Sequence, residues 1–211
     1  QSEQRKKRSR GSTSLTDCTR RMKRQEMKIT CLSDTHGRHE EVLVPEDTDL
    51  LLFAGDAGTW GTEKEMYAFN NWLGKQPGHK IVIAGNHDRC FEGLRGESLF
   101  TNATYLQDTF TGFDGLKIYG SPWQPEFCNW AFNLPRDGEE LKRKWDNIPN
   151  DVDVLITHGP PQGTLDQLEC REYVGDRLLR NRIAALPNLS CTCSGISTAR
   201  TAMCIETGCI A

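Results

Sequence analysis

Short apolar stretches that end in a polar residue recur along the chain and predict β-strands. The clearest is 80–84, in which Ile81, Val82 and Ile83 form a continuous β-branched run, typical of a strand buried on both faces. Four further stretches have the same character: 28–33, 50–54, 116–120 and 152–157. The sequence therefore predicts a sheet built from short, buried strands.

A helical pattern separates two of these strands. Thr62 and Glu65 fit a capping box, and Gly74 stands where a helix commonly ends. The apolar residues on one helical face are Met66, Phe69 and Leu73. A strand, a helix and another strand in this order indicate an α/β fold built from β-α-β units.

Two further helices are expected in the second half of the chain. One begins near Asp137, with Glu140 at its third position as part of a cap, and the other is capped by Asp176. Their expected buried residues are Leu141 and Trp145 in the first helix, and Leu179, Ile183 and Leu186 in the second. Residues 91–108 show no pattern that favours either a helix or a strand.

The segment 121–132 is rich in proline and aromatic side chains, among them Phe127, Trp130 and Phe132. Such a loop either lines a substrate pocket or covers an edge of the core, since aromatic side chains serve both purposes. The sequence leaves both interpretations open.

Composition narrows the class of protein. A chain of 211 residues and 23.8 kDa is long enough for one domain with a sizeable core. Its net charge of −3 argues against a nucleic-acid binder as a whole. No signal peptide and no apolar run near the ~20 residues that span a bilayer is visible. We therefore expect a cytoplasmic protein with no membrane partner.

Basic residues gather near the start of the chain, at 5–10 and 20–24. Such runs are typical of a solvated, disordered tail, but also of a nuclear address or an electrostatic arm for nucleic acid. We expect residues 1–27 to be a disordered tail and the folded domain to begin at Lys28. A nuclear location stays open as the alternative to a cytoplasmic one.

The nine cysteines fall into two groups. Five are scattered singly and are expected to be reduced thiols, as in cytosolic proteins: Cys18, Cys31, Cys90, Cys128 and Cys170. The other four crowd the segment 190–211, which shows no regular pattern: Cys191, Cys193, Cys204 and Cys209.

Metal-ligating side chains follow four of the predicted strands at the point where each ends. They are Asp34 and His36, then Asp56, then Asn86, and finally His158. Because α/β sheets usually hold their sites at the carboxyl ends of strands, we expect these side chains to converge. Oxygen and nitrogen donors without cysteine suit Mn, Fe or Zn. Two ions held ~3.5–4 Å apart need a bridging group, for which Asp56 is the candidate.

The motifs DTH, GD, GNHD and THGP, in this order, resemble those of the calcineurin-like metallophosphoesterases. The longer stretches ITCLSDTHGR, KIVIAGNHD, KIYGSPWQPEF and DVLITHGPPQG resemble the branch of metallophosphoesterase-domain-containing proteins, over roughly 28–189. The resemblance implies a four-layer α-β-β-α sandwich with two mixed sheets and a dinuclear metal site.

The resemblance also implies a role for each site residue. Asp34 and His36 would hold the first metal ion, Asp56 would bridge the two ions, and Asn86 and His158 would hold the second. His87 would not be a ligand but would donate a proton or a hydrogen bond at the leaving group. Asp88 would orient His87.

The function expected from the resemblance is hydrolysis of phosphodiester or phosphomonoester bonds by a metal-activated hydroxide. Two divalent ions are the expected cofactors, with manganese preferred over iron or zinc. The expected partner is a small phosphate ester, with cyclic nucleotides among the candidates.

One part of the family pattern is absent. Its fifth motif, Gly-His-x-His, supplies an imidazole to each metal ion, but no histidine follows His158 in this sequence. The corresponding place reads CTCSGIST, within 190–211. A cysteine cluster that binds a metal or forms disulfides is one explanation, although its spacing matches no common zinc pattern.

A shift of reading frame is the other explanation. If the codons of CTCSGIST are regrouped by one base, their possible translations include LHVFGHIH, which contains the missing motif. Sequencing the encoding DNA across Leu189 tests this hypothesis.

As written, the chain is expected to bind its metals more weakly and to lack, or have replaced, the last strands of the fold, which would leave open sheet edges. The alternative function is therefore a catalytically silent binding or regulatory module with the same fold.

Overall fold

The structure is a computed structural model that describes residues 26–92, 98–168, 170–195 and 203–206, the last four as backbone only. The predicted basic tail therefore lies almost wholly outside the described residues, as do positions 196–202. No helix within the described ranges is long and apolar enough to cross a membrane.

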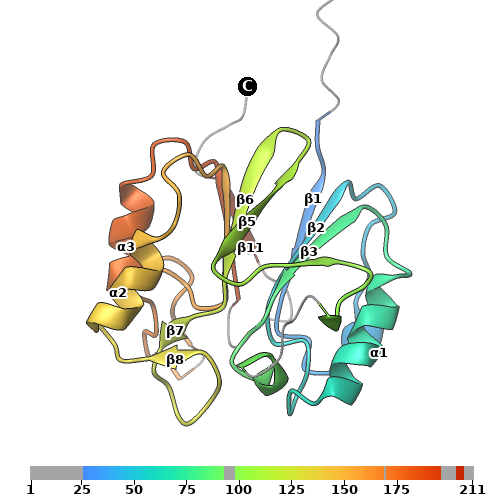
Figure 1. Ribbon diagram of the computed structural model, residues 1–211, viewed down its shortest axis with the longest axis horizontal. Helices are drawn as coiled ribbons and strands as arrows, with labels where there is room; N and C mark the ends of the chain where they lie inside the picture. The colour runs from blue at the N-terminus through green and yellow to red at the C-terminus, as the bar shows by residue number, and fades with distance from the viewer. Residues whose placement is uncertain (1–25, 93–97, 169, 196–202, 207–211) are drawn as a thin grey trace, which may run out of the picture.

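Two sheets face each other, and helices cover their outer faces, so that the molecule has four layers (Figure 1). The first sheet is parallel throughout, in the order β1 (Ile29–Leu32), β2 (Leu50–Ala54), β3 (His79–Ile83) and β4 (Thr104–Tyr105). The second has the order β11 (Met203–Glu206), β10 (Cys191–Ser194), β9 (Val154–Thr157), β6 (Leu116–Ser121) and β5 (Thr109–Phe113).

The second sheet is mixed. Its central strands β10, β9 and β6 are parallel, whereas β5 and β11 are antiparallel to their neighbours. A separate short pair is formed by β7 (Gln124–Pro125) and β8 (Asn133–Leu134). The expected four-layer α-β-β-α sandwich is confirmed, but the expectation of two mixed sheets is wrong, because every pair of the first sheet in the described residues is parallel.

Three helices complete the outer layers: α1 (Glu63–Leu73) on the first sheet, and α2 (Glu139–Asp146) and α3 (Arg177–Ala184) on the second (Figure 1). Two single 3-10 turns, η1 (His39–Glu41) and η2 (Arg89–Glu92), lie in the loops after β1 and β3.

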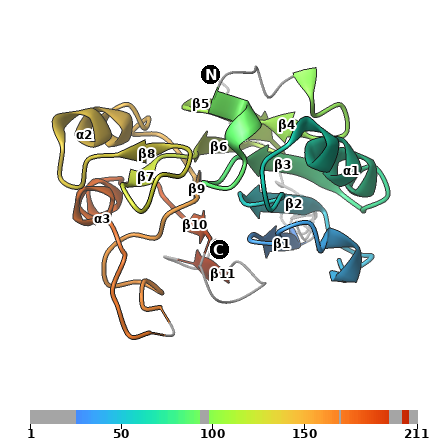
Figure 2. The ribbon, with the colours of Figure 1, turned by 90° about the horizontal axis from the view of Figure 1, so that it is seen from below.

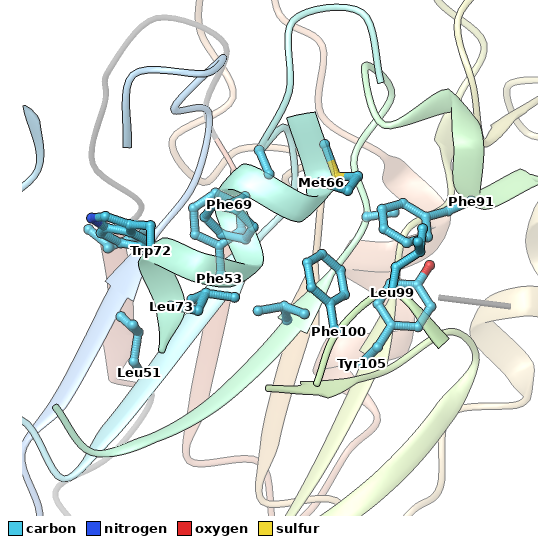
Figure 3. Packing of buried hydrophobic residues seen from close by; sticks show 14 of the residues in the cluster. Leu51, Phe53, Met66, Phe69, Trp72, Leu73, Phe91, Leu99, Phe100 and Tyr105 are labelled. Atoms are coloured by element: carbon cyan, nitrogen blue, oxygen red, sulfur yellow. The ribbon is translucent and has the colours of Figure 1, made fainter. Parts of the chain in front are cut away.

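The period-2 alternation of the strands separates the core into layers. Leu51 and Phe53 of β2 point to the outer face, where Phe69 and Trp72 of α1 cover them (Figure 3). Leu50 and Leu52 point inward and join the cluster between the two sheets. The strands are therefore buried on both faces, which explains their continuous apolar runs.

The predicted limits of α1 and the predicted N-cap of α3 are confirmed, whereas Leu186, expected on the apolar side of α3, lies beyond its end at Ala184. Thr62 and Glu65 form the capping box, Gly74 is the C-cap, and the Asp176 carboxylate accepts from the Leu178 amide at 2.8 Å. The predicted cap of α2 is wrong, because its N-cap is Gly138, which has no side chain to accept a hydrogen bond.

Strands that the sequence did not predict extend both sheets. They are β4 and β5, and in the C-terminal segment β10 and β11. Because β10 pairs in parallel with β9, the open edge expected beside β9 is not found, and that expectation is wrong.

The cysteines follow the predicted division only in part. Among the described residues Cys31, Cys90, Cys128 and Cys170 are free thiols, as expected, and so is Cys193. Cys191 takes part in a disulfide.

Candidate metal centre

The carboxyl ends of β1, β2 and β3 lie at the lower end of the sheets in Figure 1, the end onto which Figure 2 looks. Side chains that follow β1, β2, β3 and β9 come together at this end. Two sets of donors form there, each with its ligand atoms within 4.8 Å of one another: Asp34, Asp56 and His158, and His36, Asp56 and His87. Asp56 belongs to both sets. A carboxylate shared by two donor sets is the arrangement that a two-metal site requires.

His158 tests whether this site fits a cation. Its buried ring has Nδ1 2.8 Å from the Ala54 carbonyl oxygen, and Nε2 2.8 Å from Asn86 Oδ1 and 3.5 Å from Asp56 Oδ1. A neutral imidazole has one N–H, and the Ala54 oxygen takes it because a carbonyl only accepts. Two arrangements satisfy Nε2: a second proton that it donates to Asn86 Oδ1, in keeping with the raised pKa of His158, or a cation held between Nε2 and the two oxygens.

The pKa values of the two histidines His158 and His36 shift in opposite directions, because burial lowers both and the carboxylates, which raise both, outweigh burial only at His158. Burial lowers the pKa of His158, but the carboxylates of Asp56 and Asp34 outweigh burial and raise it. Burial lowers the pKa of His36, whose Nε2 lies 3.7 Å from Asp56 Oδ2 and 4.0 Å from Asp34 Oδ1. His36 is thereby kept in the neutral form that ligates metals.

Gly85 and Gly195 allow the close approach of these groups. A Cβ on Gly85 would lie 2.2 Å from Asp56 Oδ1, and a Cβ on Gly195 would lie 2.9 Å from Asp34 Oδ2. Only glycine avoids these overlaps. The end of β10 therefore belongs to the site, which the cysteine-rich sequence before Gly195 did not indicate.

His87 lies against the same donors. Its Nδ1 is 2.8 Å from the Thr59 carbonyl oxygen, which only accepts, so Nδ1 carries the proton of the neutral ring and Nε2 is the remaining reactive atom. Its ring meets the His36 ring edge-on at 4.6 Å. The resemblance implies that His87 is not a ligand, whereas the structure places it in a donor set with His36 and Asp56.

Asp88 does not orient His87, so that expected contact is wrong. Its buried carboxylate accepts hydrogen bonds from four backbone amides, those of Asp56, Ala57, Gly58 and Gly85, at 2.9 to 3.3 Å. Burial and the nearby Asp56 charge raise the pKa of Asp88 to about 6. Asp88 fixes the loop that presents Asp56, and Thr59 takes the role of orienting His87.

The donors line a cleft of about 360 Å³. Its walls include Phe127 and Trp130 of the aromatic segment, whereas Phe132 is buried in the core beneath. Part of this segment therefore lines the cleft, through Phe127 and Trp130, and part covers the core, through Phe132.

Two further lining residues, Arg136 and Tyr173, have no sequence signal that marks them. The Arg136 guanidinium donates to the carbonyl oxygens of Val174 and Gly175 at 3.2 and 3.1 Å. It thereby fixes the far wall of the cleft.

A family profile for the calcineurin-like phosphoesterases matches residues 27–195, which is most of the chain and includes every donor described above. The chain belongs to the calcineurin-like phosphoesterase family.

This calcineurin-like phosphoesterase is 44% identical over 165 residues to human metallophosphoesterase domain-containing protein 1, an alignment that covers 66% of this chain and 50% of the human protein. It is 34% identical over 194 residues to UPF0046 protein T07D4.2 of Caenorhabditis elegans, covering 77% of this chain and 49% of that protein. The chain thus spans about half the length of these relatives.

Among solved structures, TT1561 of Thermus thermophilus superposes with a TM-score of 0.55 at 17% identity, covering 79% of this chain and 80% of that one. A likeness at this identity shows the fold alone. The family typically binds divalent metals, and the donor set at the strand ends fits such ions.

Proposed function

We propose that this domain is a metal-dependent phosphoesterase that hydrolyses phosphodiester or phosphomonoester bonds, with cyclic nucleotides among its candidate substrates. The observation that carries the proposal is the position of Asp56, whose carboxylate is shared by two donor sets within 4.8 Å. A carboxylate with a purely structural role at a strand end is not expected to have imidazoles from two donor sets around it, as Asp56 has.

Five residues would hold the metals. As the resemblance implies, Asp34 and His36 would serve the first ion, Asp56 both, and Asn86 and His158 the second. The donor sets within 4.8 Å divide differently around Asp56, with Asp34 beside His158 and His36 beside His87. When bound, two divalent cations, for which we propose manganese, supply Lewis-acid activation of water and neutralise charge on the phosphate.

His87 performs the proton transfer in this proposal. Its Nδ1–H is held by the Thr59 carbonyl, so Nε2 is the atom that meets the leaving oxygen and, when protonated, donates to it. The His87 backbone amide also donates to Asp56 Oδ1 at 2.8 Å, which couples the position of the acid to that of the bridging carboxylate.

Water is the expected nucleophile. The described residues that line the cleft include no serine, threonine or cysteine. Among the described lining residues, Tyr173 therefore carries the only side-chain hydroxyl, and the serine, threonine and cysteine nucleophiles of covalent catalysis are missing.

The second candidate function is a silent binding module of the same fold. The sequence favours it at one place, since Ile196 and Thr198 stand where the resemblance expects two metal-ligating histidines. A site with fewer imidazoles binds its ions more weakly.

The test is hydrolysis of bis(4-nitrophenyl) phosphate with added Mn²⁺, together with the Mn²⁺ content of the protein after dialysis. The original chain is compared with Asp56→Asn and with Asp114→Asn, a control at the exposed turn between β5 and β6. Activity and bound Mn²⁺ that are both lost only in Asp56→Asn support the phosphoesterase. Bound Mn²⁺ without hydrolysis supports the silent module, and no bound Mn²⁺ overturns both.

A further inference from the structure

Trp130 contacts the imidazole of His87 although the two residues lie far apart in the sequence. The two rings are stacked, with centroids 4.0 Å apart and an interplanar angle of 30°. The Arg89 guanidinium carbon lies 4.9 Å from the centroid of the same indole. Arg89, Trp130 and His87 thus form one connected stack beside the metal donors.

The backbone around this stack is fixed as well. The Ala131 amide donates to the Asn86 carbonyl at 3.0 Å, and the Phe132 amide donates to Glu92 Oε1 at 2.9 Å. The Arg89 guanidinium also donates to the Asn129 carbonyl. The segment 129–132 is therefore docked on the segment 86–92 by these hydrogen bonds, and Trp130 cannot be a loosely attached wall of the cleft.

Together these contacts leave the His87 ring little freedom. The Thr59 carbonyl fixes its Nδ1, and the Trp130 indole covers its face. A general acid works only while its reactive atom stays within hydrogen-bond reach of the leaving oxygen, so a ring that swings away loses rate.

We propose that Trp130, held by Arg89, is a positioning residue that keeps His87 Nε2 directed at the leaving oxygen. The proposal rests on the phosphoesterase function proposed above. A positioning role differs from that of an aromatic surface on which the substrate stacks, because the Trp130 indole is already in contact with the His87 imidazole and the Arg89 guanidinium. Phe127, which lines the same cleft but is 53% exposed, is the matched comparison.

The kinetic test compares two leaving groups, using methyl 4-nitrophenyl phosphate and methyl phenyl phosphate with Mn²⁺. Phenolate is the poorer leaving group and depends more on a general acid than 4-nitrophenolate does. We expect Trp130→Ala to lower kcat for the phenyl ester about tenfold more than for the nitrophenyl ester. Trp130→Phe retains an aromatic face and should keep the ratio of the two kcat values, nitrophenyl ester to phenyl ester, near that of the original chain. Phe127→Ala should leave this ratio unchanged.

A double mutant makes the test specific to His87. In a His87→Gln background the acid is gone, so Trp130→Ala should cause no further change in the ratio of the two rates. A uniform loss with both esters, or an effect on KM alone, would make Trp130 a substrate contact and overturn the proposal.

The second experiment uses NMR and does not require that the protein hydrolyse any substrate. In the metal-free protein the stacked indole should shift the His87 ring protons upfield in the NMR spectrum, and Trp130→Ala should remove this shift. Signals that stay in place would overturn the proposed contact. If the original chain hydrolyses neither ester but shows the shift, the phosphoesterase function fails while the contact itself stands.

Discussion

At the scale of single residues, three of the proposed ligands have a left-handed backbone. The φ angles of Asp34, His36 and Asp56 are 53°, 44° and 60°, a conformation that costs about 1–2 kcal/mol for a residue with a side chain. Hydrogen bonds between the two loops hold it, from the Asp34 amide to the Gly55 carbonyl and from the His36 amide to the Asp56 carbonyl. The backbone of these ligand positions is thus held by hydrogen bonds from the neighbouring loop.

His87 has two candidate roles, metal ligand and general acid, and they predict different metal contents for the variant His87→Gln. We expect His87→Gln to retain both Mn²⁺ ions, because the proposed ligands are intact, and to lose about 10²- to 10⁴-fold in turnover through the missing acid. Metal analysis after dialysis, with Asp56→Asn as the variant that loses ions, measures this. A His87→Gln protein that has lost an ion would be evidence for a ligand role instead.

Asp88 should matter for stability as well as for the site. In Asp88→Asn the carboxylate that accepts four amides becomes a neutral amide with a single acceptor oxygen. Hydrogen bonds to a buried charged group contribute about 1.5–3 kcal/mol, so we expect the free energy of unfolding to fall by about 2 kcal/mol. Urea denaturation measures it, with Asp114→Asn as the exposed control. Equal stability of the two variants would contradict this role.

At the scale of elements, the start of α1 links a helix cap to the candidate metal centre. Glu65 completes the capping box with Thr62, and it also accepts from the amides of Thr59 and Trp60 at 3.0 and 3.2 Å. Thr59 is the residue whose carbonyl holds His87. The cap therefore supports the loop that orients the proposed acid.

We expect Glu65→Ala to lower the free energy of unfolding by about 1–2 kcal/mol, since it removes the cap and the hydrogen bonds to the loop. Glu63→Ala, in the same helical turn and exposed, is the matched control and should change little. Thermal or urea unfolding compares the two. If Glu63→Ala were equally destabilising, helix charge and not the cap would be responsible.

His39 of η1 packs edge-on against Phe69 of α1 at 5.4 Å and near Trp72 at 5.6 Å, and its Nδ1 has no hydrogen-bond partner in the described structure. Burial lowers its pKa, Glu40 opposes this shift and Lys75 adds to it. The unfolded chain, in which the pKa is about 6.5, then binds the proton more readily than the folded one.

Stability should therefore be full above the unfolded pKa and should fall as the pH drops from about 7 through about 6. His39→Phe, which keeps an apolar ring, should reduce this fall. Unfolding by urea at several pH values compares the two proteins, and an unchanged pH dependence in His39→Phe would assign the effect to other groups.

The sequence predicted those elements whose signals are local. The limits of α1 follow from Thr62 and Gly74, because capping involves neighbouring residues only. By contrast β5 was missed, since most of its side chains are exposed or half-buried and show no apolar alternation. Its pairing with β6 decides its structure, and that partner is not visible in its own sequence.

At the scale of the whole molecule, most of the site was predictable because parallel strands bring their carboxyl ends to one edge. Motif order alone then placed Asp34, Asp56 and His158 together, and the structure has them in one donor set. The part that could not be predicted is β10. The sequence CTCS has no distinct strand signal, and its structure is decided by the parallel pairing of Cys193 with Ile156 of β9.

This pairing brings Gly195 to the metal centre, where a Cβ would lie 2.9 Å from Asp34 Oδ2 and 3.1 Å from His158 Nδ1. The resemblance expects two imidazoles directly after this glycine. The chain has Ile196 and Thr198 there, and these positions lie outside the described residues.

We expect the double substitution Ile196→His and Thr198→His to raise the affinity for Mn²⁺ by about 10- to 100-fold, the usual effect of completing a ligand shell. Calorimetric titration with Mn²⁺ measures this, and Ile196→Ala with Thr198→Ala is the control that changes the same positions without adding donors. An equal affinity of the two double variants would show that Gly195 does not lead into the metal site. If hydrolysis rises together with the affinity for Mn²⁺, the original chain lacks only metal ligands. If the affinity rises alone, the domain is a binding module, because the proposed acid His87 is present in the original chain and in the double variant alike.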